Sequence, residues 1–363
     1  MGANTPIEWC DATWSTVGGC SIESPGCIHC YAQQLAGTRL RKHPLYAGTT
    51  DDGKGRPVFN GTMTVAAPEH PTWSWPVRWR GLKEPLLGPG QPSLIFVADM
   101  ADLFHPDRPA EAIDRVLASI VYSHHIGQLL TKRPAVMRAY FEELRRSARW
   151  LMWPHPIFGR SNFDPMVATF DAIVSRLWLG TSVERQAEAD RRREDLRALS
   201  EMGFTTFVSY EPALGPVDWK GWEFVDQVIS GGESGARARP SHPAWHRATR
   251  EFCHTVGSAY FFKQWGAWAP ACDGLGWRLE WSDESTTVIT PWGSAMTWQG
   301  FHNARMGGDL ADGYERSVTM RRVGKETAGR LLDGREHNDL PGERGRPPRT
   351  AHVATQRVTE PVA

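Results

Sequence analysis

Short runs of apolar residues recur along the chain, and polar residues follow each run directly. Such runs, rich in β-branched and aromatic side chains, are typical of strands buried on both faces of a parallel sheet. Amphipathic helical patterns lie between several runs, which predicts an α/β fold built as a full or partial (β/α) barrel. We expect strands with their polar ends at 93–104, 126–134, 176–184, 205–216, 226–235 and 259–268, and helices at 109–123, 184–203 and 243–256.

The polar residues that follow the strands are the first candidates for chemistry. In a (β/α) barrel the carboxyl ends of the strands meet at one rim, and that rim carries the active site. Taken alone, any one of these residues is equally well explained as an ordinary loop cap, but their repetition after successive strands favours a functional rim. They are Asp99, Asp102, Thr131, Lys132, Ser182, Glu184, Ser209, Glu211, Glu233, Ser234, Lys263 and Gln264.

Two regions interrupt the alternation of strands and helices. Residues 43–92 are rich in Gly, Pro and Trp and predict a long loop insertion within a barrel domain of residues 1–268. Short Trp-bearing pieces in 269–340 predict a small appendage packed on the barrel. The Pro- and Arg-rich stretch 341–363 has the composition of a disordered tail.

Composition narrows the class of protein. The 363 residues include 41 Lys and Arg against 41 Asp and Glu, so the net charge is zero, which argues against a basic protein that coats nucleic acid. We find no apolar run long enough to span a membrane and no signal-peptide pattern, and expect a cytoplasmic protein without a membrane partner. In a reducing cytosol, clustered thiols indicate metal binding or catalysis before disulfides.

Three of the six cysteines, Cys20, Cys27 and Cys30, lie in the stretch "GCSIESPGCIHC". A Cys-x-x-Cys pair lets two thiolates reach one metal centre from a tight turn, and a helix-forming sequence follows Cys30. Three interpretations are open. They are a structural zinc site with Cys10 or His29 as fourth ligand, a redox dithiol of Cys27 and Cys30, and a [4Fe–4S] cluster with one iron open to a further ligand.

The chain resembles an uncharacterised phage and prophage family with a three-cysteine motif, itself similar to radical S-adenosylmethionine (SAM) proteins. The resemblance spans residues 7 to 337 and is carried by stretches such as "IEWCDATWSTVGGCSIESPGCIHCYA", "IFVADMADLFHPDRP", "VISGGESGARARPSHPAWHR" and "VGKETAGRLLDGRE". The gap of six residues between the first two cysteines departs from the commonest radical motif, which is shorter. Relatives often carry Thr at position 10, which implies that Cys10 is not a ligand.

This resemblance implies a radical SAM enzyme on a TIM-like barrel with a Trp-rich C-terminal appendage. Cys20, Cys27 and Cys30 would ligate a [4Fe–4S] cluster, and the reduced cluster would cleave SAM to a 5′-deoxyadenosyl radical that takes hydrogen from a substrate. It also implies a flavodoxin- or ferredoxin-like reductant, a phage partner protein, and a host-cytoplasmic location. The phage context points to a nucleic-acid base or nucleotide as the group that is modified or repaired.

Position on the rim, together with the resemblance, assigns roles around the expected cluster. Radical enzymes often hold the amino group of SAM with a Gly-Gly-Glu motif, and "GGESG" at 231–235 has these letters after a late strand. Candidates for binding SAM are Tyr31, Asp99, Asp102, Ser182, Glu184, Gly231 and Gly232, and candidates for catalysis are Glu233, Glu211 and Lys263.

Basic residues near the strand ends predict a cationic mouth on a protein of zero net charge. Such a mouth suits a substrate that carries phosphate, and a neighbouring Trp would add a surface on which bases stack. A solvated basic loop is the alternative for Arg237 and Arg239. The expected substrate-binding residues are Lys132, Arg133, Arg237, Arg239, Gln264 and Trp265.

Two other classes of function stay open at this point. A non-radical iron–sulfur or zinc protein that binds nucleic acid predicts bound metal without cleavage of SAM. A partner subunit that scaffolds another phage enzyme predicts that changes to the rim carboxylates leave activity intact while surface changes abolish it.

Overall fold

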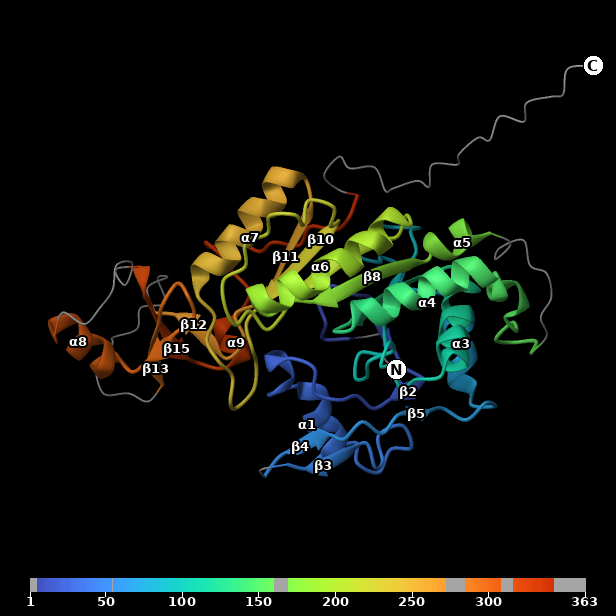
Figure 1. Cartoon of the computed structure of the whole chain (residues 1–363), viewed down its shortest axis with the longest axis horizontal. Helices are drawn as coiled ribbons and strands as arrows, with labels where there is room; N and C mark the ends of the chain where they lie inside the picture. The colour runs from blue at the N-terminus through green and yellow to red at the C-terminus, as the bar shows by residue number, and fades with distance from the viewer. Residues whose placement is uncertain (1–4, 54, 160–168, 272–284, 308–315, 343–363) are drawn as a thin grey trace, which may run out of the picture.

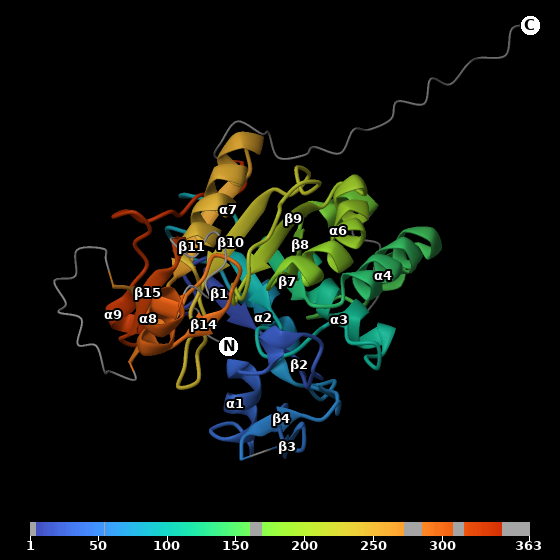
Figure 2. The same ribbon diagram turned by 60° about the vertical axis from the view of Figure 1, so that its left-hand side comes forward.

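The computed structural model describes residues 5–53, 55–159, 169–271, 285–307 and 316–342 (Figure 1). Its largest element is a seven-stranded parallel sheet in which neighbouring strands follow chain order. The sheet curls into half a barrel, so the partial form of the predicted (β/α) barrel is the one adopted (Figure 2). The strands are β1 (Ala12–Trp14), β6 (Leu94–Val97), β7 (Ile126–Thr131), β8 (Leu177–Ser182), β9 (Thr205–Tyr210), β10 (Gln227–Gly231) and β11 (Ala259–Gln264).

Helices cover the convex face of the half-barrel (Figure 1). The three expected helices are confirmed to within two residues at each end, whereas α4 is an addition whose buried Met137, Phe141 and Leu144 recur at helical spacing. The connection from β9 to β10 has no helix, and buried Trp219 and Trp222 anchor it instead. The helices are α3 (Ala110–Val121), α4 (Pro134–Ser147), α5 (Phe170–Val174), α6 (Gln186–Glu201) and α7 (Pro243–Val256), with a 3-10 turn, η3 (Arg149–Met152), after α4.

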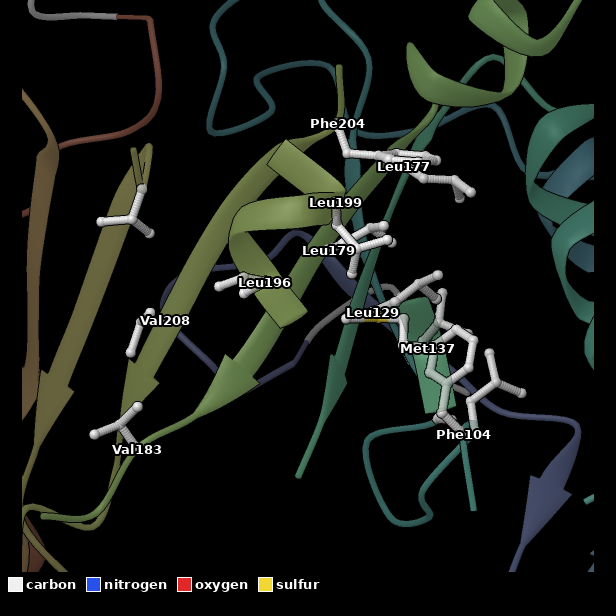
Figure 3. Close-up of a cluster of buried hydrophobic side chains, with 14 of the residues drawn as sticks. Phe104, Leu129, Met137, Leu177, Leu179, Val183, Leu196, Leu199, Phe204 and Val208 are labelled. Atoms are coloured by element: carbon white, nitrogen blue, oxygen red, sulfur yellow. The ribbon is translucent and has the colours of Figure 1, made fainter. Parts of the chain in front are cut away.

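Both faces of the sheet are buried, as the apolar runs predict. On the convex face, strand residues such as Leu177 and Leu179 form one cluster with Leu196 and Leu199 of α6 (Figure 3). Alternate residues form a second cluster on the concave face, composed of Trp9, Phe96, Trp178, Phe207, Ile229, Phe261, Leu340 and their neighbours. The two clusters fix the strands in register and hold the carboxyl ends of the strands at one edge.

The stretch predicted as a loop insertion at 43–92 contains short elements of its own. Two small antiparallel sheets and two short helical segments belong to this region, and Ala32, Ala36, Tyr46, Phe59 and Met100 form a separate small core beside α1 (Tyr31–Gly37). The elements are β2 (Val17–Gly18) paired with β5 (Thr64–Val65), β3 (Thr50–Asp52) paired with β4 (Pro57–Phe59), η2 (Pro71–Ser74) and α2 (Trp75–Arg78).

The expected appendage contains a four-stranded antiparallel sheet of β12 (Trp268–Pro270), β15 (Val318–Arg322), β13 (Thr286–Ile289) and β14 (Ala295–Met296), with α8 (Trp298–Gly307) and α9 (Lys325–Ala328). The chain then returns along β11, where Phe262 N donates to His337 O at 2.9 Å. This segment covers the edge of the sheet and places Leu340 in the concave core. The tail predicted from residue 341 lies, from 343 onward, outside the described residues. No described helix is long and apolar enough to cross a membrane.

Candidate functional site

The three clustered cysteines line one pocket at the carboxyl edge of the half-barrel. Cys20 follows β2, Cys27 ends the turn η1 (Pro25–Cys27), and Cys30 precedes the first residue of α1. The sheet contributes Phe96 and Leu130 from its concave face. From the strand ends the pocket receives Asp99, Asp102, Thr131, Lys132 and Ser182.

The backbone of the cysteine loop, residues 19–30, is folded tightly. Cys27 N donates to Ser24 O at 2.9 Å, Cys30 N donates to Cys27 O at 3.3 Å, and Gln33 Nε2 donates to Cys27 O at 2.8 Å. Gly26 packs against Glu184, and a Cβ at position 26 would lie 2.6 Å from Glu184 Oε1. Glycine is therefore required at this position by the close approach of the loop to β8.

Burial sets the protonation of the thiols. It raises the pKa of Cys20 to about 12, with nearby Asp102 acting in the same direction and Arg133 against it. Burial also raises the pKa of Cys30. A metal that binds here has to displace thiol protons. Among the described residues, no three His, Cys, Asp or Glu side chains converge on the position of a single metal ion.

The other cysteines lie elsewhere. Cys10 is buried in the concave core, where burial raises its pKa to about 12 and its thiol is 3.7 Å from Ile7 O. Cys253 is fully buried among the apolar residues under α7. Neither residue lines the pocket of the three clustered cysteines, and Cys272 lies outside the described residues.

Glu184, after β8, is fully buried and holds the centre of the cysteine loop. Its Oε1 accepts from Ser24 Oγ at 2.6 Å and pairs with Lys132, and its Oε2 is 2.9 Å from Arg192 Nη1. Although burial acts in the opposite direction, Lys132 and Arg192 hold the pKa of Glu184 below its ordinary value. The carboxylate is therefore charged and has a partner on each oxygen.

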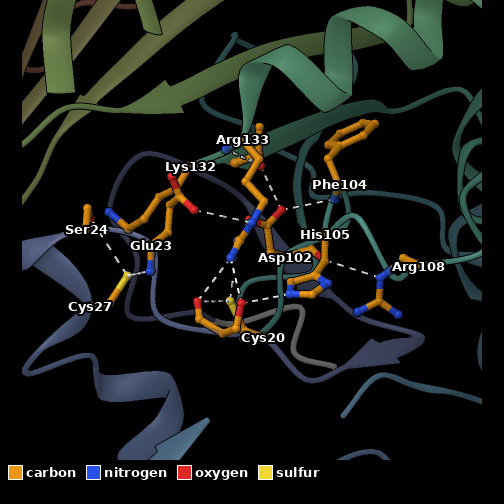
Figure 4. A network of polar contacts seen from close by, with 12 residues as sticks. Cys20, Glu23, Ser24, Cys27, Asp102, Phe104, His105, Arg108, Lys132 and Arg133 are labelled. Atoms are coloured by element: carbon orange, nitrogen blue, oxygen red, sulfur yellow. Dashed lines mark hydrogen bonds and ion pairs between the residues drawn. The ribbon is translucent and has the colours of Figure 1, made fainter. Parts of the chain in front are cut away.

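A second network joins β6 and β7 to the start of the loop (Figure 4). Asp102 Oδ2 is 2.7 Å from Arg133 Nη1, and Asp102 Oδ1 accepts from Thr131 Oγ1 at 2.7 Å. Arg133 in turn donates to Ser21 Oγ at 2.8 Å and comes within 4.0 Å of the Cys20 thiol. His105 Nε2 lies 2.8 Å from the same Ser21 hydroxyl.

A third network joins β10 to the end of the loop. Glu233 Oε2 lies 3.2 Å from His29 Nδ1, and Arg239 contacts both carboxylate oxygens, at 2.6 and 2.8 Å. Arg239 also donates to Pro25 O at 3.0 Å. Burial opposes ionisation of Glu233, but its bonds with Arg239 lower its pKa below the ordinary value.

Two other strand-end groups have different surroundings. Glu211 forms an ion pair with Lys263 at 3.2 Å and accepts from Ser209 Oγ at 3.3 Å. Asp99 lines the pocket without an ion pair to any described residue, and burial raises its pKa. Tyr31 is 51% exposed, and its hydroxyl donates to Asp99 O at 2.7 Å.

The predicted cationic mouth is largely neutralised. Lys132, Arg133, Arg239 and Lys263 each form an ion pair with a carboxylate, whereas Arg237 is exposed and has no ion pair within the described parts of the chain. A set of opposite charges at this rim therefore replaces the excess of positive charge expected from residue types.

Four residues predicted to bind a ligand pack instead against neighbouring parts of the protein. Trp265 is buried, and its indole donates to Leu331 O at 2.9 Å, so its ring offers no exposed face for stacking. Gln264 is buried with its amide 3.3 Å from Gly232 O. A Cβ at Gly232 would lie 2.0 Å from Trp265 O, so the close packing of these two backbone segments requires glycine at position 232. A Cβ at Gly231 would lie 2.8 Å from Glu211 Oε1.

Sequence reasoning missed the hydroxyl groups of the loop itself and considered His29 only as a metal ligand. Ser21, Ser24 and His29 each bond to a group from the barrel, and Arg192 reaches the site from α6. The sequence does place hydroxyl and imidazole side chains between the cysteines, and this could have indicated that the loop is bonded to another part of the protein.

A comparison with protein-family models matches residues 4–341, nearly the whole chain, to a family described as "Protein of unknown function (DUF5131)". No curated protein and no solved structure matches the chain.

Proposed function

Because the chain belongs to this family of unknown function, its activity has to be argued from its own site, and we propose a radical SAM-type [4Fe–4S] enzyme. The supporting observation is that Cys20, Cys27 and Cys30 line one pocket at the carboxyl edge of a parallel half-barrel. Active sites of (β/α) barrels lie at that edge. We also propose that the chain is related to phage proteins and that its half-barrel is of the radical SAM type.

The residues of the pocket fit an iron–sulfur cluster in two respects. The donor set is three thiols, the ligands that such clusters take, and the walls include apolar Phe96 and Leu130, which exclude water. When bound and reduced by a flavodoxin- or ferredoxin-like protein, such a cluster supplies the electron that cleaves SAM to methionine and a 5′-deoxyadenosyl radical.

The chain's own residues would act around that chemistry. Cys20, Cys27 and Cys30 would hold the cluster, and Asp99 and Ser182, which line the same pocket, would bind polar groups of SAM. The Glu211–Lys263 pair lies at the ends of β9 and β11 and is the candidate for contacting substrate. Tyr31 would close the pocket from the α1 side, where its hydroxyl bond to Asp99 O fixes the ring.

Anaerobic reconstitution tests this function. The full chain is treated with iron and sulfide, reduced with dithionite and incubated with SAM, and 5′-deoxyadenosine is measured by chromatography beside iron and sulfide content. We expect about four irons per chain and formation of 5′-deoxyadenosine by the wild type. Cys27→Ala should lose both, while Cys10→Ala, which removes a buried thiol outside the pocket, should keep both. Iron retained by Cys27→Ala, or zinc in its place, would contradict the proposal.

For the substrate we propose a nucleic acid, whose base enters the pocket. The mouth offers exposed Tyr31 and Ile22, at 51% and 48% exposure, which suit a flat apolar group. The phosphates would contact a basic strip formed by Arg39, Arg41 and Lys42. These three side chains are exposed without an ion pair to described residues, while Leu40 between them packs on the small core that Cys30 also contacts.

Binding of a single-stranded oligonucleotide, followed by fluorescence anisotropy, tests the strip in the metal-free protein. Each phosphate contact contributes about 0.7 to the slope of log affinity against log salt. The triple variant Arg39→Gln, Arg41→Gln and Lys42→Gln should therefore bind more weakly and lose about 2 from that slope. The control is Arg80→Gln with Lys83→Gln, two exposed cations before the start of β6, at the opposite edge. Equal binding by both variants would exclude the strip.

A further inference from the structure

Three carboxylates from three strands each hold a different part of the cysteine loop. Asp102, through Arg133, reaches Ser21 beside Cys20. Glu184 accepts from Ser24, whose hydroxyl is 3.8 Å from the Cys27 thiol. Glu233 contacts His29 beside Cys30. Every clustered cysteine therefore has an anchored residue next to it in sequence or in space.

We propose that Asp102, Glu184 and Glu233 are positioning residues that hold the cysteine loop with its thiols toward the pocket, and are not groups that contact substrate or SAM. This proposal depends on the proposed function only in one respect, namely that the group bound by the three thiols is an iron–sulfur cluster. It replaces the catalytic role expected for Glu233 and the SAM-binding role expected for Asp102 and Glu184.

The surroundings of these carboxylates favour positioning over catalysis. Glu184 and Glu233 do not line the pocket, and both oxygens of each are occupied by cations or loop groups. Asp102 lines the pocket, but Arg133 and Thr131 occupy its two oxygens. Asp99, by contrast, lines the pocket and forms no ion pair with a described residue, so its carboxylate is the better candidate for contacting a ligand.

The physical benefit is preorganisation. A loop of Gly, Ser and Pro residues would otherwise lose conformational entropy when its three thiols bind one centre. Bonds to a rigid sheet impose that order during folding. Groups that orient ligands from behind are a general feature of metal sites, and their loss weakens binding without removing a ligand.

Thiol reactivity in the reduced, metal-free full chain tests the positioning role without any cluster or SAM. Alkylation by iodoacetamide is followed at each cysteine by peptide mass spectrometry. His29→Ala removes the bond to Glu233, and Ser24→Ala removes the bond to Glu184 together with the contact to the Cys27 thiol; both leave the barrel's ion pairs in place. We expect alkylation of buried Cys27 to rise about fivefold in each variant, while fully buried Cys253 stays unreactive.

A double-mutant cycle separates positioning from general loosening. Glu233 reaches the loop through His29 and also through Arg239, which donates to Pro25 O, so Glu233→Gln should raise Cys27 reactivity at least as much as His29→Ala does. Adding His29→Ala to Glu233→Gln should raise it no further. The matched control is Glu188→Gln, which removes a buried, ion-paired carboxylate of α6 that does not contact the loop. Wild-type Cys27 rates in the loop variants would overturn the proposal, as would a parallel rise at Cys253.

A positive alkylation result remains valid even if the protein binds no cluster, since the assay contains no metal. A negative result leaves the proposed function intact, because a cluster can also assemble on a mobile loop. Failure of the positioning proposal and failure of the radical SAM proposal are therefore distinguishable.

Discussion

The acidic residues at the carboxyl edge fall into two groups that the sequence alone does not separate. Glu184 and Glu233 are almost fully buried, paired with arginine, and bonded to the cysteine loop. Asp99 lies on the same edge, has no described ion-pair partner, and lines the pocket. The partners of a strand-end carboxylate, and not its position on the rim, therefore indicate whether it supports the site or faces the ligand.

The largest expected effect is on stability, at Glu184. Glu184→Gln leaves Arg192, which is 1% exposed, and Lys132 without their charged partner. Breaking a buried ion pair from one side costs about 3–5 kcal/mol. Urea unfolding at pH 7 should show a loss of that size, whereas Asp99→Asn should show none, because burial already disfavours the charge of Asp99. Equal losses in the two variants would remove the distinction between the groups.

A second prediction concerns the ligand. Asp99→Asn should keep the iron content of the reconstituted protein but weaken SAM binding about tenfold, equivalent to about 1.4 kcal/mol, because it removes a charge that faces the pocket. Equilibrium dialysis with labelled SAM measures the change. Glu188→Gln serves as the reference for a carboxylate removed elsewhere. Unchanged affinity in Asp99→Asn would show that Asp99 does not contact the ligand.

The smallest expected effect is on the pH dependence of folding stability. The charge of Glu233 should stabilise the fold, whereas the charge of Asp99 should destabilise it. The pKa of Glu233 is lowered from 4.5, so its contribution to stability is present above about pH 4.5 and is lost as the pH falls through the folded value. The pKa of Asp99 is raised by burial, so its charge destabilises the fold at neutral pH. The stability that Glu233→Gln loses relative to wild type should therefore be larger at pH 7 than at pH 4. Asp99→Asn should be at least as stable as wild type at pH 7.

Unfolding free energies of both variants at pH 4 and pH 7 measure these differences. A loss in Glu233→Gln that does not change with pH would mean that its charge is not what stabilises the fold.

Much of the architecture could be predicted from the sequence because local patterns determine it. Apolar runs buried on both faces became the parallel strands, and α3, α6 and α7 formed where helical spacing indicated. The short elements within 43–92 could not be predicted in the same way, since strands of two or three residues carry too little periodicity.

The candidate site could be predicted by residue type but not by partner. The cysteines, Asp99 and Lys132 do meet in one pocket. The pairing of Lys132 with Glu184, and of Ser24 with the same carboxylate 160 residues away, depends on the curvature of the sheet. The role of Trp265 could not be predicted either, because an aromatic residue after a strand can equally be a stacking surface or part of the core. In this protein Trp265 belongs to the core.

The electron paramagnetic resonance spectrum of the reduced, reconstituted protein, recorded with and without SAM, tests the proposed cluster and its open iron. If the three cysteines hold a [4Fe–4S] cluster with one iron open, a cluster signal appears and its g values shift when SAM is added. Cys27→Ala loses the signal, and Cys10→Ala keeps both the signal and the shift. A cluster signal that SAM leaves unchanged, or a protein that takes up zinc and no cluster, would contradict the proposed radical SAM function.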